Sequence, residues 1–188
     1  EEVAFEQALL ATGANVRRLN VDGCQLEGIH YLRALSNTDA IVRDAADAEH
    51  VVLIGGSYIG TEVAASLTLL GKRCTIVMQE AVTLENGFGK QAGGFFHRVL
   101  EEHGVEIVGS DALGRFEGDG DRVVKVVTEA GRELPAEVVV IGAGVTPEVT
   151  LAKAAGLELG ERGGVRCDSR LRTSATGVFA AGDICEYD

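Results

Sequence analysis

The sequence predicts an α/β fold, a doubly wound parallel sheet that carries an additional antiparallel β-meander. From residue 51 to residue 108, short apolar runs alternate with helical patterns, which is the strand–helix alternation of a parallel sheet. These runs are continuous rather than alternating, as expected of strands that are buried on both faces. Between residues 112 and 134, short strand patterns instead follow one another across Gly-Asp and Ala-Gly turns, which is typical of an antiparallel meander.

The composition is that of a folded domain rich in glycine turns. The chain has 188 residues, of which 46% are hydrophobic, with 25 glycines and 2 prolines. This length allows one good core, or one domain together with pieces of another. The formal net charge of −12 and the sequence pI of about 4.8 disfavour nucleic acid and anionic membrane surfaces as partners. No apolar run approaches the roughly 20 residues of a membrane-spanning helix, so no membrane partner is expected.

The cysteines and histidines form no metal-binding pattern. Cys24, Cys74, Cys167 and Cys185 are far apart in the chain without a Cys-x-x-Cys, and the 4 histidines show no zinc spacing. We expect Cys74 and Cys185 to be buried thiols, because both lie in apolar runs. Unpaired cysteines of this kind fit a reduced, cytoplasmic compartment.

The first 50 residues predict separate elements. Residues 3–10 are expected to form a strand that runs into Ala11-Thr12-Gly13-Ala14. Residues 26–42 predict a loop followed by a helix, and residues 45–49 a small, charged linker. The chain does not begin with methionine, and we expect it to open within a folded element.

Residues 51–62, VVLIGGSYIGTE, carry the strongest functional signal. An apolar strand ends in two glycines, and a helical pattern follows at 58–70. A string of the Gly-x-Gly-x-x-Gly type between a strand and a helix predicts a Rossmann-like dinucleotide site, in which the helix N-terminus receives a pyrophosphate. Gly55 is expected to form the tight turn and Gly60 to let the helix pack closely. Ser57 replaces the middle glycine, and its hydroxyl could itself donate to a phosphate.

The later elements follow from apolar spacing and from glycine stops. They are a strand at 74–78, a loop at 81–89, a helix at 90–103, a strand at 105–108, meander strands at 115–117, 122–127 and 132–134, a strand at 137–141, a helix at 148–155 and a strand at 178–181. Within the helix at 90–103, Phe95 and Phe96 are expected in the core. His97 and His103 are expected at the surface without a catalytic role.

The position that selects the nucleotide ribose is unusual. A carboxylate about 20 residues after the glycines normally bonds the 2′-hydroxyl of NAD, whereas an arginine there receives the 2′-phosphate of NADP. Met78 stands at the usual acidic position, and Glu80 is the candidate to replace it. No arginine follows this strand before Arg98, so we expect NADH to be preferred over NADPH. Glu80 as an ordinary solvated loop residue remains the alternative.

A second glycine turn, Gly142-Ala143-Gly144, ends a predicted parallel strand. Parallel sheets bind their ligands beyond the carboxyl ends of their strands, and we expect this backbone to pass the nicotinamide.

Three separated strings together resemble the pyridine nucleotide–disulfide oxidoreductase superfamily. They are Ala11-Thr12-Gly13, residues 55–62 and residues 173–183, TSATGVFAAGD. Residues 26–42, LEGIHYLRALSNTDAIV, resemble more narrowly the linker of the ferredoxin reductase and apoptosis-inducing-factor-like branch. The resemblance covers nearly the whole chain.

The resemblance implies an FAD domain interrupted by an inserted NAD(P)H domain. Residues 1–43 are then an FAD-domain remnant with its linker, 44–144 the NAD(P)H-binding domain, and 145–188 a truncated return segment of the FAD domain. We therefore expect the chain to be an internal part of a larger reductase, inactive alone, with one FAD fingerprint upstream.

The resemblance also assigns residues to the two cofactors. It places FAD on Thr12, Gly13, Arg17, Gly182 and Asp183. Taken with the glycine string, the ribose-selecting position and the second glycine turn, it leaves these candidate contacts for the nicotinamide nucleotide: Gly55, Gly56, Ser57, Tyr58, Ile59, Gly60, Glu62, Glu80, Gly142, Ala143 and Gly144. Glu62 would lie beside the nicotinamide and the flavin, although a carboxylate in the first turn also favours a helix terminus without any ligand. Asp183 as a plain turn residue is likewise left open.

The implied activity is hydride transfer from NADH to FAD and electron transfer to a ferredoxin-type acceptor. Alternatives are a disulfide reductase or an NADH or peroxide oxidase of the same superfamily, and an NADH-sensing regulatory protein of the apoptosis-inducing-factor-like type. Hydride transfer needs no general base, so no residue of the chain is assigned a catalytic role. The oligomeric state stays open.

Overall fold

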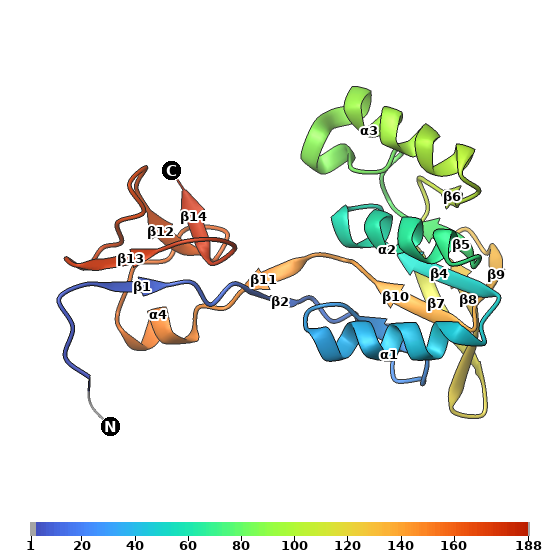
Figure 1. Cartoon of the computed structure of the whole chain (residues 1–188), viewed down its shortest axis with the longest axis horizontal. Helices are drawn as coiled ribbons and strands as arrows, with labels where there is room; N and C mark the ends of the chain where they lie inside the picture. Colours follow the sequence, from blue (N-terminus) through green and yellow to red (C-terminus); the bar gives the residue numbers. More distant parts are fainter. Residues whose placement is uncertain (1–2, 188) are drawn as a thin grey trace. The chain divides into compact units, whose positions relative to one another are not determined.

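The computed structural model describes residues 3–187, which form two compact units (Figure 1). Unit 2 is the continuous segment Arg18–Gly144, and unit 1 combines the segments on either side of it. Residues 18–43, which the sequence predicts to belong with the first flanking segment, lie in unit 2. The reason is that a strand and a helix of this segment pack on the sheet of unit 2.

A five-stranded parallel sheet forms the centre of unit 2. Its strands, in spatial order, are β3 (Ile29–Tyr31), β10 (Val138–Ile141), β4 (His50–Ile54), β5 (Arg73–Val77) and β6 (Glu106–Val108). All four neighbouring pairs are parallel. From β4 the chain moves outward through β5 to β6 and then returns to β10 on the other side of β4. The carboxyl ends of β4 and β10 therefore mark the topological switch point, where such sheets bind ligands.

Different layers cover the two faces of this sheet (Figure 1). Helices α1 (Leu35–Ala46), α2 (Tyr58–Leu69) and α3 (Glu85–Glu102) contribute to one core cluster, together with Leu53 and Ile76 from the sheet. The antiparallel meander, β7 (Leu113–Asp119), β8 (Arg122–Thr128) and β9 (Glu133–Pro135), supplies the other cluster. The predicted fold class, an α/β parallel sheet with an antiparallel meander, is confirmed.

Helix α3 differs from its prediction in two ways. It begins at Glu85 instead of residue 90, because one helical turn precedes a break at Gly89, where φ is 75° and ψ is 168°. The prediction that Phe95 and Phe96 are core residues is wrong, since they are 55% and 42% exposed. The buried face instead contains Gly93, which packs closely against the Thr83 carbonyl. A Cβ at this position would lie only 2.5 Å from that carbonyl oxygen.

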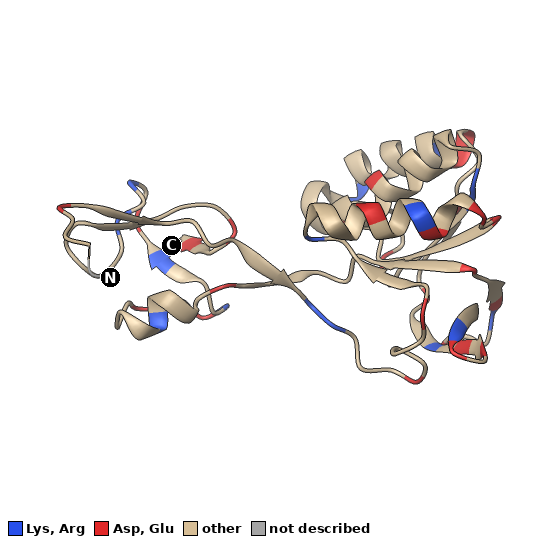
Figure 2. Ribbon diagram, turned by 60° about the horizontal axis from the view of Figure 1, so that its bottom comes forward, with Lys and Arg blue, Asp and Glu red and all other residues tan. Residues whose placement is uncertain are grey.

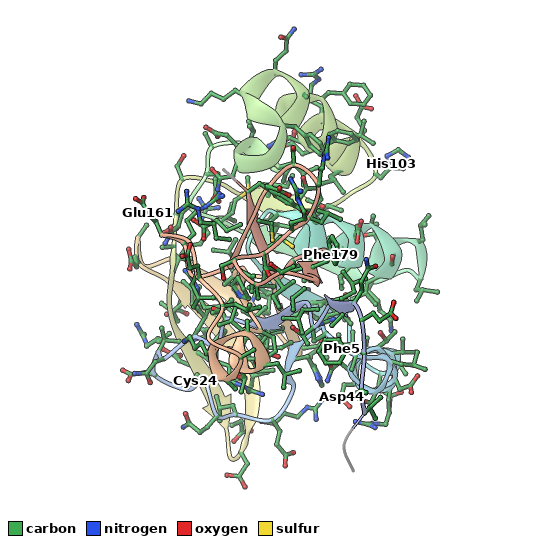
Figure 3. All side chains as sticks on the ribbon, turned by 90° about the vertical axis from the view of Figure 1, so that its left-hand side faces the viewer. Phe5, Cys24, Asp44, His103, Glu161 and Phe179 are labelled. Carbon is green, nitrogen blue, oxygen red and sulfur yellow. The ribbon has the colours of Figure 1, made fainter. Side chains whose placement is uncertain are left out.

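The histidines of this helix behave differently from each other. His103 projects outward near the end of α3 (Figure 3), as expected. His97 is instead half-buried, and its Nδ1 accepts a hydrogen bond of 3.3 Å from the Thr83 backbone N–H. It lies four residues after Gly93 and therefore shares the buried face of α3.

Unit 1 consists of short strand pairs around a small core. Strand β1 (Ala8–Leu10) pairs in parallel with β13 (Val178–Ala180), and β12 (Val165–Cys167) with β14 (Cys185–Tyr187). Strand β2 (Ala14–Val16) pairs antiparallel with β11 (Val145–Pro147), and helix α4 (Thr150–Ala154) follows. Four of these three-residue strands, β2, β11, β12 and β14, were not predicted, because so short a segment carries no readable period.

The cysteines and the charges add two facts. Cys74 is buried as expected, and burial raises the pKa of its thiol, whereas Cys185 is only half-buried.

Acidic and basic positions are interspersed along both units (Figure 2). No group of three or more metal-ligating side chains occurs among residues 3–187, and none of the helices described there is long and apolar enough to cross a membrane.

Candidate dinucleotide-binding site

The turn between β4 and α2 leaves no room for side chains at two glycines. Gly55 has a φ of 105°, in the region that favours glycine, and a Cβ there would lie 2.5 Å from the carbonyl oxygen of Gly142. A Cβ on Gly60 would collide with the carbonyl oxygen of Gly55. The turn is therefore tight at Gly55, and α2 packs directly against it at Gly60, as the glycine spacing predicts.

Helix α2 begins immediately after the turn without a side-chain cap. Ser57 is the N-cap residue, but its side chain makes no hydrogen bond to the first helical turn. Its hydroxyl instead donates to the carbonyl oxygen of Gly142 over 3.2 Å. Donors of the first turn remain available to a ligand, and the helix dipole adds a partial positive charge there. Tyr58, the first helical residue, is 51% exposed at the same end.

Two other predicted contacts lie on the same helix. Ile59 is partly buried and packs against the core beneath the helices. Glu62 is exposed and is the fifth residue of α2, so no acidic residue lies in the first turn. The alternative in which Glu62 merely stabilises the helix terminus is wrong, because the dipole effect falls off within the first turn.

The second glycine turn joins the first one. The Gly142 backbone N–H donates to the carbonyl oxygen of Ile54 over 2.8 Å, which links the carboxyl ends of β10 and β4. Ala143 packs against the meander-side core, and Gly144 has a φ of 93°. The structure thus brings residues 55–60 and 142–144 together at the switch point.

Met78 fills the space beneath the first turn. It directly follows β5, is 2% exposed, and its sulfur occupies the place that a Cβ on Gly56 would need. The usual position of a ribose-binding carboxylate therefore holds a buried apolar side chain. Glu80 lies two residues further along and is half-buried, and its Oε1 accepts a hydrogen bond of 2.5 Å from Asn86 Nδ2.

The segment that follows β5 is attached to the glycine turn. The Leu84 backbone N–H donates to the carbonyl oxygen of Gly56 over 2.8 Å. Leu84 itself has a φ of 58°, a left-handed conformation that is uncommon for a residue with a side chain. Sequence reasoning missed Leu84 and Asn86, because neither residue type signals such a conformation or contact.

Four of the five residues predicted to contact FAD, all except Arg17, lie at one edge of unit 1. Strands β1 and β13 are parallel, so Thr12-Gly13 and Gly182-Asp183 both emerge at their carboxyl ends, and the Ala181 N–H donates to the Leu10 carbonyl over 2.9 Å. Asp183 is exposed there. Arg17 is also exposed and directly follows β2.

Glu148, which the sequence did not single out, orders the first of these turns. Its carbonyl oxygen accepts the Thr12 hydroxyl over 2.6 Å, and its N–H donates to the Gly13 carbonyl over 2.8 Å. Hydrogen bonds from Thr150 and from Asn15 hold the pKa of its carboxyl group below the usual range. Glu148 therefore fixes the turn through its backbone atoms, while its carboxylate accepts hydrogen bonds from Asn15 and Thr150.

Comparison with known proteins identifies the family. The family model described as pyridine nucleotide-disulphide oxidoreductase matches residues 1–187. The rubredoxin-NAD(+) reductase of Pseudomonas putida is 34% identical over 183 residues, which cover 97% of this chain and 47% of the relative. The ferredoxin–NAD(+) reductase component of the biphenyl dioxygenase system of Paraburkholderia xenovorans (strain LB400) is 36% identical over 185 residues, which cover 98% of this chain and 45% of the relative.

The solved structures agree with this result. The ferredoxin reductase for the CYP199A2 system from Rhodopseudomonas palustris superposes with a TM-score of 0.90 at 31% identity, covering 98% of this chain and 45% of that one. The chain spans about half the length of the curated relatives that it matches. Since the family model extends over 1–187 and the fold agrees, the chain belongs to the pyridine nucleotide-disulphide oxidoreductase family.

Proposed function

We propose that unit 2 binds NAD(H) at the switch point of its sheet, within an FAD-dependent NAD(P)H oxidoreductase. The pyrophosphate lies on the N-terminus of α2, where Gly55 and Gly60 allow close backbone approach and Ser57 leaves the first turn uncapped. The nicotinamide lies beside residues 142–144, and Glu62 contributes from α2, the helix that also holds the pyrophosphate. The observation that carries this proposal is the uncapped end of a 12-residue helix between two hydrogen-bonded glycine turns.

In this proposal the cofactors supply the chemistry, and the chain supplies their positioning. NADH, when bound, supplies a hydride that FAD accepts. The chain's own residues bind and orient the nucleotide. In unit 1, Thr12, Gly13 and Asp183 form the edge at which we propose that FAD is held, with Arg17 after the next strand.

The proposed electron acceptor is a one-electron carrier of the ferredoxin type. The relatives are named as reductases of rubredoxin and ferredoxin, which supports this class of acceptor. The test uses the reductase that contains this chain, supplied with NADH and either a ferredoxin or a disulfide. Reduction of the ferredoxin is expected. Reduction of the disulfide, or of oxygen, with no transfer to ferredoxin would place the protein in a disulfide reductase or NADH oxidase branch.

The proposal includes a preference for NADH over NADPH. The Glu80 carboxylate, after the end of β5, accepts a ribose 2′-hydroxyl but repels a 2′-phosphate. Isothermal titration calorimetry of the 188-residue chain with each nucleotide tests this, and we expect NADPH to bind at least about tenfold more weakly. Binding of neither nucleotide would contradict the proposed site, whereas tighter binding of NADPH would contradict only the role of Glu80.

A further inference from the structure

We infer that Asn86 is a specificity-determining residue, because it fixes the carboxylate of Glu80 that selects the nucleotide ribose. The inference rests on the proposed NAD(H) site and deepens it by naming the residue that positions the ribose ligand. Glu80 and Asn86 are the two ends of the segment 80–86, which leads from β5 into the first turn of α3. We call this segment the ribose strap. Asn86 Nδ2 donates to Glu80 Oε1 over 2.5 Å.

Two backbone hydrogen bonds fix the ribose strap in place. The Leu84 N–H donates to the Gly56 carbonyl over 2.8 Å, which attaches the strap to the pyrophosphate turn. The Ser110 N–H donates to the Glu80 carbonyl over 2.9 Å, which attaches its start to the segment after β6. The Glu80 backbone is therefore held against Ser110, and the far part of the strap is held against the glycine turn through Leu84.

The conformation of Leu84 directs Asn86 back towards Glu80. Its left-handed backbone, with φ 58° and ψ 15°, persists in folded proteins only where surrounding contacts enforce it. The Leu84 carbonyl also accepts the N–H groups of Gly87 and Phe88 over 3.1 and 2.9 Å, which closes the first turn of α3. The chain thus reverses sharply, and a residue six positions after Glu80 reaches its carboxylate.

The geometry leaves one carboxylate oxygen for the nucleotide. An ionised carboxylate has two oxygens with about four acceptor sites, and Asn86 uses one of them, on Oε1. Glu80 Oε2 can then accept a ribose hydroxyl, and the side chain has already lost the rotamer freedom that binding would otherwise cost. Because the Asn86 amide is neutral, the negative charge of Glu80 still opposes a 2′-phosphate. Asn86 therefore strengthens NADH binding selectively.

The burial of Met78 explains why two residues share this task. Met78 is packed beneath Gly56 at the usual acidic position, so no carboxylate can stand there. The acceptor moves two residues along the chain onto the strap, where it lies in a loop rather than at the end of a strand. A loop carboxylate needs a partner to hold it, and Asn86 is that partner.

The experiment is a double-mutant cycle with two nucleotides. Wild-type chain, Glu80→Ala, Asn86→Ala and the double variant are titrated with NADH and with NADPH by calorimetry. Glu80→Ala is expected to weaken NADH about 10- to 100-fold, the range for a hydrogen bond to a charged group. Asn86→Ala is expected to weaken NADH about three- to tenfold and to change NADPH by less than about twofold. In the Glu80→Ala background, the second substitution is expected to have no further effect on NADH.

A control and a rescue variant separate positioning from loss of structure. Gln91→Ala, at an exposed position on the same helix, is expected to leave both affinities unchanged. Glu80→Gln combined with Asn86→Asp reverses the donor and the acceptor of the pair, and it is expected to bind NADH more tightly than Asn86→Asp alone.

The inference fails if Asn86→Ala weakens both nucleotides equally, or weakens NADH as much without Glu80 as with it. It also fails if Glu80→Ala leaves NADH binding unchanged, and the proposed site then still stands. Failure of the wild-type chain to bind either nucleotide would overturn the site and the inference together.

Discussion

Gly60→Ala, compared with Gly94→Ala, tests whether close packing at the glycine turn is required. Both positions are glycines inside helices, α2 and α3. A Cβ on Gly60 would collide with the Gly55 carbonyl oxygen, whereas a Cβ on Gly94 has no neighbour within 4 Å among the described residues. The same substitution therefore adds a clash at one site and only improves helix propensity at the other.

The magnitudes follow from these surroundings. Overpacking a tight site costs about 1–3 kcal/mol, so Gly60→Ala is expected to lower the midpoint of thermal unfolding by several degrees. Replacing an open helical glycine by alanine contributes up to about 1 kcal/mol, so Gly94→Ala is expected to raise it by roughly 2–4 °C. Because the turn must shift away from α2, Gly60→Ala is also expected to weaken NADH binding by more than about tenfold, and Gly94→Ala to leave it unchanged.

The assay is thermal unfolding followed by circular dichroism, together with calorimetric NADH titration of both variants. A Gly60→Ala chain as stable as Gly94→Ala, with wild-type NADH affinity, would refute the packing argument. Loss of stability with unchanged affinity would show that the clash is real but that the turn does not hold the nucleotide.

Three further predictions concern single side chains. Ser57→Ala removes the 3.2 Å hydrogen bond to Gly142, and calorimetry is expected to show about two- to fivefold weaker NADH binding, whereas stronger binding would contradict a role for this contact. The backbone N–H groups of His50 and Glu49 hold the pKa of Glu137 below its usual range, so its stabilisation is present above the unfolded-state pKa of about 4.3 and is lost as pH falls through the folded value. Glu137→Gln is therefore expected to lower the unfolding midpoint at pH 7, by an amount that shrinks as pH falls through the lowered pKa of Glu137. A difference that grows towards low pH would contradict this. Phe95→Ser is expected to lower the free energy of unfolding, measured in urea, by less than about 1 kcal/mol, because Phe95 is 55% exposed. A loss of about 3–5 kcal/mol would indicate instead that Phe95 is a core residue.

Local patterns predicted the elements that carry their own signal. The strands β4 and β10 are continuous apolar runs, and the spacing of Gly55 and Gly60 identified the dinucleotide turn before any contact was known. These features depend on residues close together in the sequence, where periodicity and turn chemistry apply.

The remaining features depend on contacts between distant positions or on too few residues. Ser57 and Gly142 are 85 positions apart, and no local pattern of either residue predicts their hydrogen bond. Gly93 packs against Thr83 and so defines the buried face of α3. Phe95 therefore lies on the exposed face, although it is hydrophobic. The left-handed Leu84 is a residue that sequence rules place in helices or strands, so the path of the ribose strap was not predictable.

The most direct test of the central claim is an NADH titration of the isotope-labelled chain, followed by amide nuclear magnetic resonance. A nucleotide on the N-terminus of α2 changes the surroundings of the backbone N–H groups there. The account predicts that the amides of residues 55–60 and 142–144 shift together with one dissociation constant. Shifts confined to other residues, or no shift at NADH concentrations in the millimolar range, would contradict it.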